Sequence, residues 1–152
     1  SAFPYRAPNR PLASVSELRA VDEITPELYR LIAPFLSAWP AEGSKVNLLT
    51  APPEVLAALN EDDALEPLSA QQVARIIELR DDGMLKEVDT FIEDVMFSDG
   101  ATDELRDLVD IKSSWFLLDA RVEIADRERR LYSVLHRQGR AISVVHRTEG
   151  EL

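Results

Sequence analysis

The chain has 152 residues, 45% of them hydrophobic and 30% charged, and its 28 acidic and 17 basic side chains give a formal charge of −11. This length and apolar content are enough for a folded core, which excludes an unstructured tail. The absence of cysteine excludes disulfides and thiolate metal sites, and no apolar run reaches the roughly 18 residues of a membrane-spanning helix.

The negative charge is concentrated in the middle of the chain. Residues 1–59 carry 5 basic and 6 acidic side chains, residues 60–105 carry 3 and 14, and residues 106–152 carry 9 and 8. An acidic surface repels the phosphates of nucleic acids. The chain begins with SAFPYRAP and not with Met, and we expect it to be a piece of a longer protein.

The first third of the chain predicts an extended lead-in followed by two helices. Residues 1–13 carry three prolines and no hydrophobic periodicity, which disfavours a helix. A helix is predicted over SVSELRAV, with Ser14 or Ser16 as its cap. A second is predicted over ITPELYRLIAPFLSAW, because Thr25 is a cap followed by proline at the first helical position. Pro34 should kink or shorten this helix.

The middle third repeats this helical pattern. In VNLLTAPPEVLAAL, after a short β-like entry, Thr50 and the proline pair that follows it are predicted to start a helix. Ser69 and Gln72 form a capping-box pattern for the next helix, which the spacing predicts to end at Asp82-Gly83. VDTFIEDVMF then predicts one more short amphipathic helix.

From Ser114 onward the pattern changes to strands. Three β-like runs follow one another, WFLLDARVEIA, RLYSVLHR and AISVVHR. Gln138 and Gly139 suit a tight hairpin between the last two. In the first run, the alternate residues from Phe116 to Ile124 are apolar and face one way. A three-stranded meander with one apolar face needs a cover, either from the helical units or from outside this chain.

The predicted fold class is therefore α+β. A helical α-domain, built from two units with the plan of helix-hairpin-helix or SAM-like domains, precedes the antiparallel strands. The predicted limits are an extended lead-in over 1–13, an α-domain over 14–112 with units of about 14–44 and 45–97 plus a short acidic helix, and a β-meander over 113–152.

No combination of residues predicts a catalytic or cofactor site. His136 and His146 stand near the ends of paired strands beside arginines, and we interpret them as solvent-facing strand residues. Adjacent carboxylates such as Asp81-Asp82 are interpreted as a solvated face. Only five glycines are present, and they form neither a P-loop nor a dinucleotide fingerprint. The sequence therefore predicts a protein that is not an enzyme and needs no cofactor.

One acidic stretch has the oxygen ligands that calcium prefers. Asp99, Asp103 and Glu104 flank a glycine, but their spacing is not that of an EF-hand. Calcium binding here stays an alternative to an ordinary acidic loop and helix cap.

The turn NEDDALEPLSA decides against a nucleic-acid-binding hairpin. Such a hairpin needs glycine, so that backbone N–H groups approach phosphate, and nearby Lys or Arg. This turn has no glycine and carries Glu61, Asp62, Asp63 and Glu66. A helix-hairpin-helix nucleic-acid-binding module remains the alternative interpretation of the chain.

Five motifs in order resemble the K-type minor pseudopilin (GspK) family of the bacterial type II secretion system. They are NRPLASVSELRAV, ITPELYRLIAPFL, VNLLTAPPEVLAAL, LSAQQVARIIELR and SSWFLLDARV, and they cover nearly the whole chain. Leu49 stands where the VN-x-NTA pattern of the family has a second Asn. The motif residues, for which the resemblance implies a structural role, are Asn47, Thr50, Ala51, Pro52, Pro53, Glu54, Ser113, Ser114 and Phe116.

The resemblance implies a non-enzymatic subunit at the tip of the secretion pseudopilus. Such a subunit assembles with the I- and J-type minor pseudopilins to initiate or cap the filament, meets exoproteins and the secretin, and supports export of folded exoproteins. The resemblance further implies a periplasmic domain of a bacterial inner-membrane protein, with its anchoring helix and first strands outside this chain. The α-domain would be inserted into a pilin-like sheet.

Overall fold

The computed structural model of the chain divides into two compact units, which we describe separately. It describes residues 9–41, 43–59, 67–95 and 103–149. The first unit contains Ser1–Gly43, Leu117–Leu135 and Ser143–Leu152. The second contains Ser44–Phe116 and His136–Ile142.

The first helical segment is a 3-10 helix, η1 (Val15–Ala20), where the sequence predicted an ordinary helix. Its predicted cap is confirmed, because the hydroxyl of Ser14 accepts a hydrogen bond from the Ser16 N–H. The Glu17 N–H donates to the Ser14 carbonyl and the Val21 N–H donates to the Leu18 carbonyl, and this spacing of three residues is that of a 3-10 helix.

The second helix, α1 (Pro26–Ile32), starts and ends as the sequence predicts. The Thr25 hydroxyl accepts from the Leu28 N–H at 3.2 Å, and Pro26 occupies the first helical position. At Pro34 the helix gives way to a 3-10 turn, η2 (Ala33–Phe35), which confirms the predicted shortening. The apolar stripe of this helix stays largely open, with Leu31 70% exposed.

The second unit packs short helices around one hydrophobic core. Its elements are β1 (Val46–Asn47), α2 (Pro53–Ala57), α3 (Ala70–Asp81), α4 (Val88–Val95), α5 (Asp103–Leu108) and β2 (Val109–Asp110). The fully buried apolar side chains of this core are Leu48, Leu56, Ile76, Leu79, Phe91, Val95, Leu105 and Val109.

Helix α3 confirms the capping signals read from the sequence. The Ser69 hydroxyl accepts from the Gln72 N–H, and the Gln72 side chain accepts in return from the Ser69 N–H, so the capping box is complete. Beyond the helix, Gly83 has a φ of +66°, a backbone conformation that residues with a side chain rarely adopt. The predicted stop at Asp82-Gly83 is therefore correct.

Helix α2 starts differently from the prediction. Its N-cap is Pro52, with no side-chain capping bond, and Pro53 is the first helical residue. Thr50 lies earlier, in a turn in which its N–H donates to the Asn47 carbonyl at 3.1 Å. The prediction that Thr50 starts the helix was wrong, because proline geometry at 52 and 53 fixes the start without a hydroxyl cap.

The sequence did not predict that β1 and β2 pair in parallel. Val46 lies opposite Val109 and Asn47 opposite Asp110, and the Leu48 N–H donates to the Asp110 carbonyl at 2.8 Å. The beginning and the end of the helical segment therefore lie side by side.

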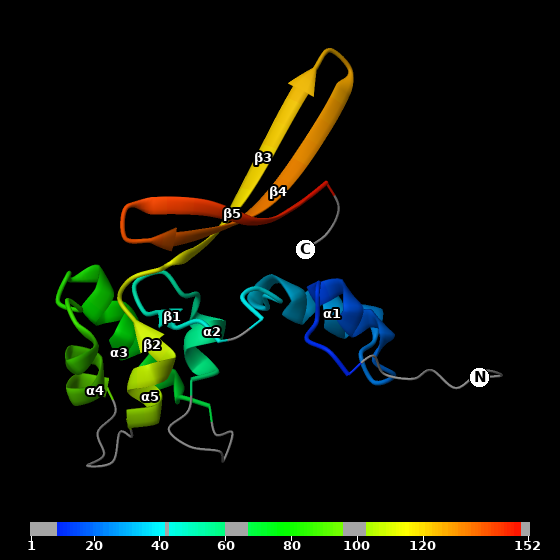
Figure 1. Cartoon of the computed structure of the whole chain (residues 1–152). Coiled ribbons are helices and arrows are strands. Elements are labelled where there is room, and N and C mark those ends of the chain that lie inside the picture. Colours follow the sequence, from blue (N-terminus) through cyan, green and yellow to red (C-terminus); the bar gives the residue numbers. More distant parts are fainter. Residues whose placement is uncertain (1–8, 42, 60–66, 96–102, 150–152) are drawn as a thin grey trace. The chain divides into compact units, whose positions relative to one another are not determined.

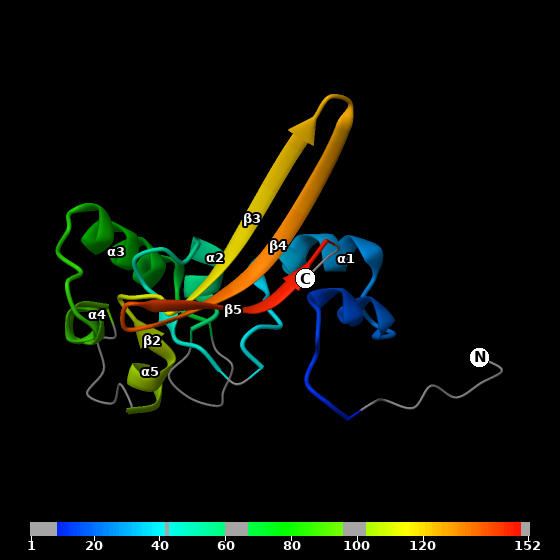
Figure 2. The same cartoon turned by 45° about the horizontal axis from the view of Figure 1, so that its top comes forward.

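The three predicted strands form one sheet in the order β3-β4-β5, with β4 in the middle (Figure 1 and Figure 2). They are β3 (Trp115–Ile124), β4 (Arg127–Gln138) and β5 (Ala141–Thr148). The second hairpin turns at Gly139 and Arg140, one residue later than predicted, and Gly139 has a φ of +61°. This conformation suits the tight turn and explains why glycine stands there.

The two faces of β3 differ in chemistry within the first unit. One face carries Leu118, Val122 and Ile124, which are 48%, 52% and 72% exposed. Alternate residues of a strand point to opposite faces, so Leu117 lies on the other face, together with the charged residues of the strand. We call Leu118, Val122 and Ile124 the apolar β3 face. These side chains are exposed, so of the two covers that the sequence left open, the one from outside this chain is favoured.

Candidate functional site

The family motif residues are brought together by the β1–β2 pairing, although they are far apart in the sequence. The amide of Asn47 donates to the Ser113 hydroxyl at 2.9 Å across 66 positions, and its carbonyl oxygen accepts from the Leu49 N–H at 2.9 Å. The Ala51 N–H donates to the backbone carbonyl of Asn47 at 2.9 Å. Asn47 thus shapes the turn that leads to α2 and ties it to the segment before β3.

An arginine from α3 fixes the other end of this turn. The Arg80 guanidinium donates to the Ala51 carbonyl at 3.0 Å, and Ala51 is buried. A buried carbonyl without a partner is costly, and a charged donor makes a stronger bond than a neutral one. Helix α3 therefore positions the proline pair at which α2 begins.

A second arginine holds the Ser113-Ser114 pair. The Arg137 N–H donates to the Ser114 carbonyl at 2.7 Å, and its guanidinium donates to the Ser113 carbonyl at 2.7 Å. The same guanidinium lies over the ring of Phe116, 5.5 Å from its centroid, which is within the range of a cation–π contact. Three motif residues thus share one arginine.

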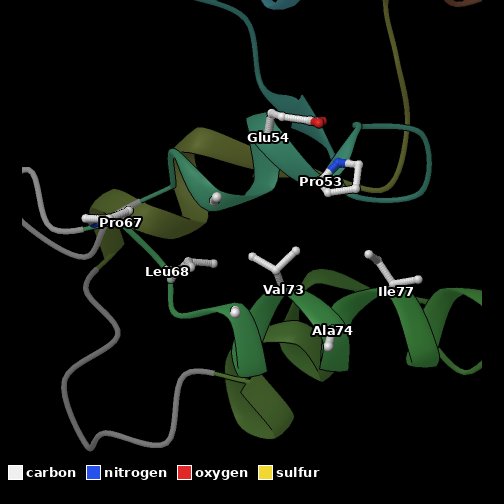
Figure 3. A pocket seen from close by; sticks show the side chains of 9 residues that line it. Pro53, Glu54, Pro67, Leu68, Val73, Ala74 and Ile77 are labelled. Atoms are coloured by element: carbon white, nitrogen blue, oxygen red, sulfur yellow. The ribbon is translucent and has the colours of Figure 1, made fainter.

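Pro53 and Glu54 of the motif border an open apolar groove between α2 and α3. Its volume is about 560 Å³. Val73 and Ile77 rise from α3 toward α2, and Leu68 reaches into the same space from the segment before α3 (Figure 3). The groove has no combination of groups for proton transfer or nucleophilic attack. What it can do chemically is bind apolar side chains.

The two histidines are partly buried against tryptophans. His136 stacks on Trp115 with 4.2 Å between ring centroids and 9° between planes, and His146 stacks on Trp39 at 5.2 Å and 14°. The interpretation of both histidines as solvent-facing was wrong, because stacking removes one ring face of each from water. No strand periodicity indicates which aromatic residue lies opposite a histidine.

Ion pairs cover the charged face of the β3–β4 hairpin. Arg130 donates to Asp119 from two nitrogens, one bond being 2.8 Å, and Arg121 pairs with Glu128. The hydrogen bond from Arg130 lowers the pKa of Asp119 below its ordinary value, and bonding to Glu128 raises the pKa of Arg121. All four side chains are exposed to solvent, so these ion pairs add little to the stability of the fold.

The predicted calcium ligands and the acidic turn after α2 lie largely outside the described residues. Asp99 and the acidic turn over 60–66 lie outside the described residues, as do the side chains of Asp103 and Glu104, so calcium binding stays an alternative to an ordinary acidic loop. In the described part of the chain, no three His, Asp or Glu side chains are grouped to hold a metal. Among the described helices, none is long and apolar enough to cross a membrane.

Two residues of this region had no signal in the sequence. Arg80 and Arg137 stand 29 and 24 positions from the carbonyls that their side chains bind. From the sequence, an arginine in a helix or near a hairpin is normally interpreted as a surface charge. Only tertiary packing brings its side chain close enough to donate a hydrogen bond to a distant backbone carbonyl.

Models of one protein family match most of the chain. The type II secretion system protein K model for the first domain matches residues 1–41, and the main protein K model matches residues 46–112. The chain belongs to the type II secretion system protein K family. The second match includes the motif residues Asn47, Pro53 and Glu54.

Individual members of the protein K family are distant relatives of this chain. Protein K of Pectobacterium carotovorum subsp. carotovorum is 26% identical over 147 residues, covering 97% of this chain and 44% of that protein. Protein K of Aeromonas hydrophila is 31% identical over 134 residues, covering 88% of this chain and 40% of that protein. The chain thus spans less than half the length of these curated relatives.

A solved structure shares the fold. A chain of the GspK-GspI-GspJ complex from the enterotoxigenic Escherichia coli type 2 secretion system superposes with a TM-score of 0.68. The likeness covers 100% of this chain and 53% of that chain, at 22% sequence identity. The α+β class is confirmed as helices followed by a three-stranded sheet of the GspK type.

Proposed function

We propose that this chain is part of the periplasmic domain of a K-type minor pseudopilin, which acts at the tip of the type II secretion pseudopilus. The observation that carries the proposal is the match of both protein K family models, in order, over residues 1–41 and 46–112. The fold shared with a chain of the GspK-GspI-GspJ complex supports assembly with I- and J-type minor pseudopilins. In this proposal the protein has no enzymatic activity and supports export of folded exoproteins as a structural part.

The apolar β3 face supports a pilin-like sheet that is completed by other segments. Leu118, Val122 and Ile124 are about half or more exposed, whereas the opposite face of the same strand carries Asp119 and Arg121 in ion pairs. Apolar side chains in a row on one face of a sheet normally lie against a helix or a second layer. Segments of the longer protein and neighbouring pseudopilins are the proposed cover.

The acidic character of the chain disfavours the nucleic-acid alternative. The formal charge is −11, and only 3 of the 17 basic residues lie within 60–105, where the hairpin turn would meet phosphate. Nucleic-acid binding without a basic surface lacks its main source of affinity. We do not favour this alternative.

Co-expression with I- and J-type minor pseudopilins tests the proposal. We expect the three proteins to elute together in size-exclusion chromatography. Correctly folded protein that elutes alone in the presence of both partners would contradict the proposal.

Two neighbouring leucines provide a matched pair of variants for this experiment. Leu118→Asp places a charge on the apolar β3 face, and Leu117→Asp places the same charge on the opposite face of the strand. Both side chains are exposed, so neither change should cost more than about 0.5 kcal/mol of stability. We expect Leu118→Asp to reduce complex formation and Leu117→Asp to leave it intact. Equal loss in both variants would argue against the apolar β3 face as the assembled surface.

A further inference from the structure

The groove between α2 and α3 is too open to enclose a small molecule. It is lined by apolar side chains, among them Leu68, Val73 and Ile77 (Figure 3), and Glu54 and Ala74 at its border are exposed to solvent. Sites for small ligands normally bury most of the ligand surface. An open apolar groove with helical walls is instead suited to an amphipathic helix, whose apolar face lies between the walls.

The walls of the groove allow a helix to approach closely. The residues that face it from α3 include Ala70 and Ala74, and Ala57 faces it from α2. Small side chains at a contact reduce the distance between helix axes toward the lower end of the 8–10 Å range. The α3 residues that line the groove extend from Ala70 to Ile77, about 12 Å along the helix axis, which matches about two turns of a partner helix.

The acidic side chains beside the groove favour a partner with basic groups. Glu54 lines the groove, and among the described residues no cation forms an ion pair with it. Asp81 follows Ile77 by four positions, beyond the groove on the same side of α3. Its side chain is 72% exposed and forms a long ion pair of 4.0 Å with Arg80, which leaves most of the carboxylate open to solvent. The only arginine on the groove segment of α3, Arg75, is already bound to Glu78 at 2.7 Å.

The unit that contains the groove carries a net negative charge, like Glu54 and Asp81 beside the groove. The second unit carries 17 acidic and 8 basic residues. A partner with Lys or Arg would be drawn to this unit, and an acidic partner would be repelled.

From this geometry we propose that the α2–α3 groove binds an amphipathic helix of another protein, with aliphatic side chains on one face and Lys or Arg flanking them. This site goes beyond assembly of the minor pseudopilins through the sheet and does not rest on it. The aliphatic side chains lie between Val73 and Ile77, and the basic groups approach Glu54 and Asp81.

A phage-displayed library of random peptides, each as long as α3 at 12 residues, tests this proposal on the chain itself. We expect selected peptides to share aliphatic residues at helical spacing with flanking Lys or Arg. In an NMR titration, their binding should shift amide signals of α2 and α3. Selection of acidic peptides, of peptides without this pattern, or of none would overturn the proposal, and so would signal shifts confined to other elements.

Exposed alanines provide matched variants for the same experiment. Ala74→Gln fills the groove, and we expect it to weaken binding of the selected peptides about tenfold or more. Ala70→Gln fills it at the other end and should act in the same direction. Ala58 is the exposed C-cap residue of α2 and does not line the groove, so Ala58→Gln should leave binding unchanged. Equal weakening by Ala58→Gln and Ala74→Gln would overturn the proposal.

A separate variant tests how much the charge of Glu54 contributes to peptide binding. Glu54→Gln should weaken binding of Lys-bearing peptides about threefold at low salt, and the difference should fade at high salt. An unchanged affinity at low salt would overturn the role of Glu54. The chain could instead dimerise in a concentration-dependent manner, and Ala74→Gln could abolish the dimer. This result would show that the groove binds a second copy of the chain, and it would overturn the proposal.

Discussion

The side-chain amide of Asn47 is hydrogen bonded to the hydroxyl of Ser113, 2.9 Å away and 66 positions later in the chain. The bond joins the two segments that enter and leave the helical part of the second unit. Both side chains are half-buried, so water competes only partly for the same groups.

Replacing Asn47 by Ala should lower the free energy of unfolding by about 1–2 kcal/mol. The change removes the bond to Ser113 and the bond from the Leu49 N–H, and each is worth about 1 kcal/mol. Ser113→Ala removes only the first and should cost about half as much. Urea denaturation measures both variants. A midpoint unchanged from that of the parent chain would contradict the structural role of Asn47.

Ser69→Ala should destabilise α3 by about 1 kcal/mol, because the Gln72 N–H loses its capping partner. Ser69→Asp keeps an acceptor at the cap and serves as the control, with stability close to that of the parent chain. Thermal unfolding followed by circular dichroism compares the two. If Ser69→Asp were as unstable as Ser69→Ala, the loss would not come from the cap.

The stack of His136 on Trp115 should contribute about 0.5–1.5 kcal/mol beyond the area that it buries. His136→Phe retains a flat ring against Trp115 and should be more stable than His136→Ala by about this amount. Chemical denaturation followed by tryptophan fluorescence gives the comparison. Equal stability of the two variants would show that the ring stack contributes nothing.

The ion pair of Asp119 with Arg130 should be visible in the titration of the carboxylate. The hydrogen bond from Arg130 holds the pKa of Asp119 below its ordinary value of 3.8. A depressed folded-state pKa stabilises the fold above the unfolded-state pKa, and this contribution is lost as the pH falls through the lower, folded-state value. NMR detection of the carboxyl carbon measures the folded-state pKa directly.

Arg130→Gln should return the pKa of Asp119 toward its ordinary value. Arg147→Gln is a control, because the Arg147 side chain binds the Ser133 hydroxyl and not Asp119. A pKa of Asp119 that stays the same in Arg130→Gln would contradict the pairing.

The sequence predicted those features that depend on neighbouring residues. Thr25 before Pro26, Ser69 before Gln72 and Gly83 after α3 each act within one helical turn, and the structure places all three as predicted. The strands followed from period-two alternation, which likewise needs only local sequence.

The features that the sequence did not predict depend on distant residues. The parallel pairing of β1 with β2 joins strands of two residues each, too short to produce a periodic pattern. The bonds from Arg80 and Arg137 to backbone carbonyls exist only once the fold has brought these segments together. Thr50 was misassigned for a local reason, since the proline pair starts α2 without a hydroxyl cap.

The pairing of β1 with β2 has an evolutionary consequence. Residues 46 and 109 are neighbours in space, so the helical segment between them leaves the surrounding chain at almost the point where it returns. A segment with adjacent ends can gain or lose helices without changing the distance that the host domain must span. Members of the protein K family could therefore vary this segment in size while its two ends, at Val46 and Val109, stay paired.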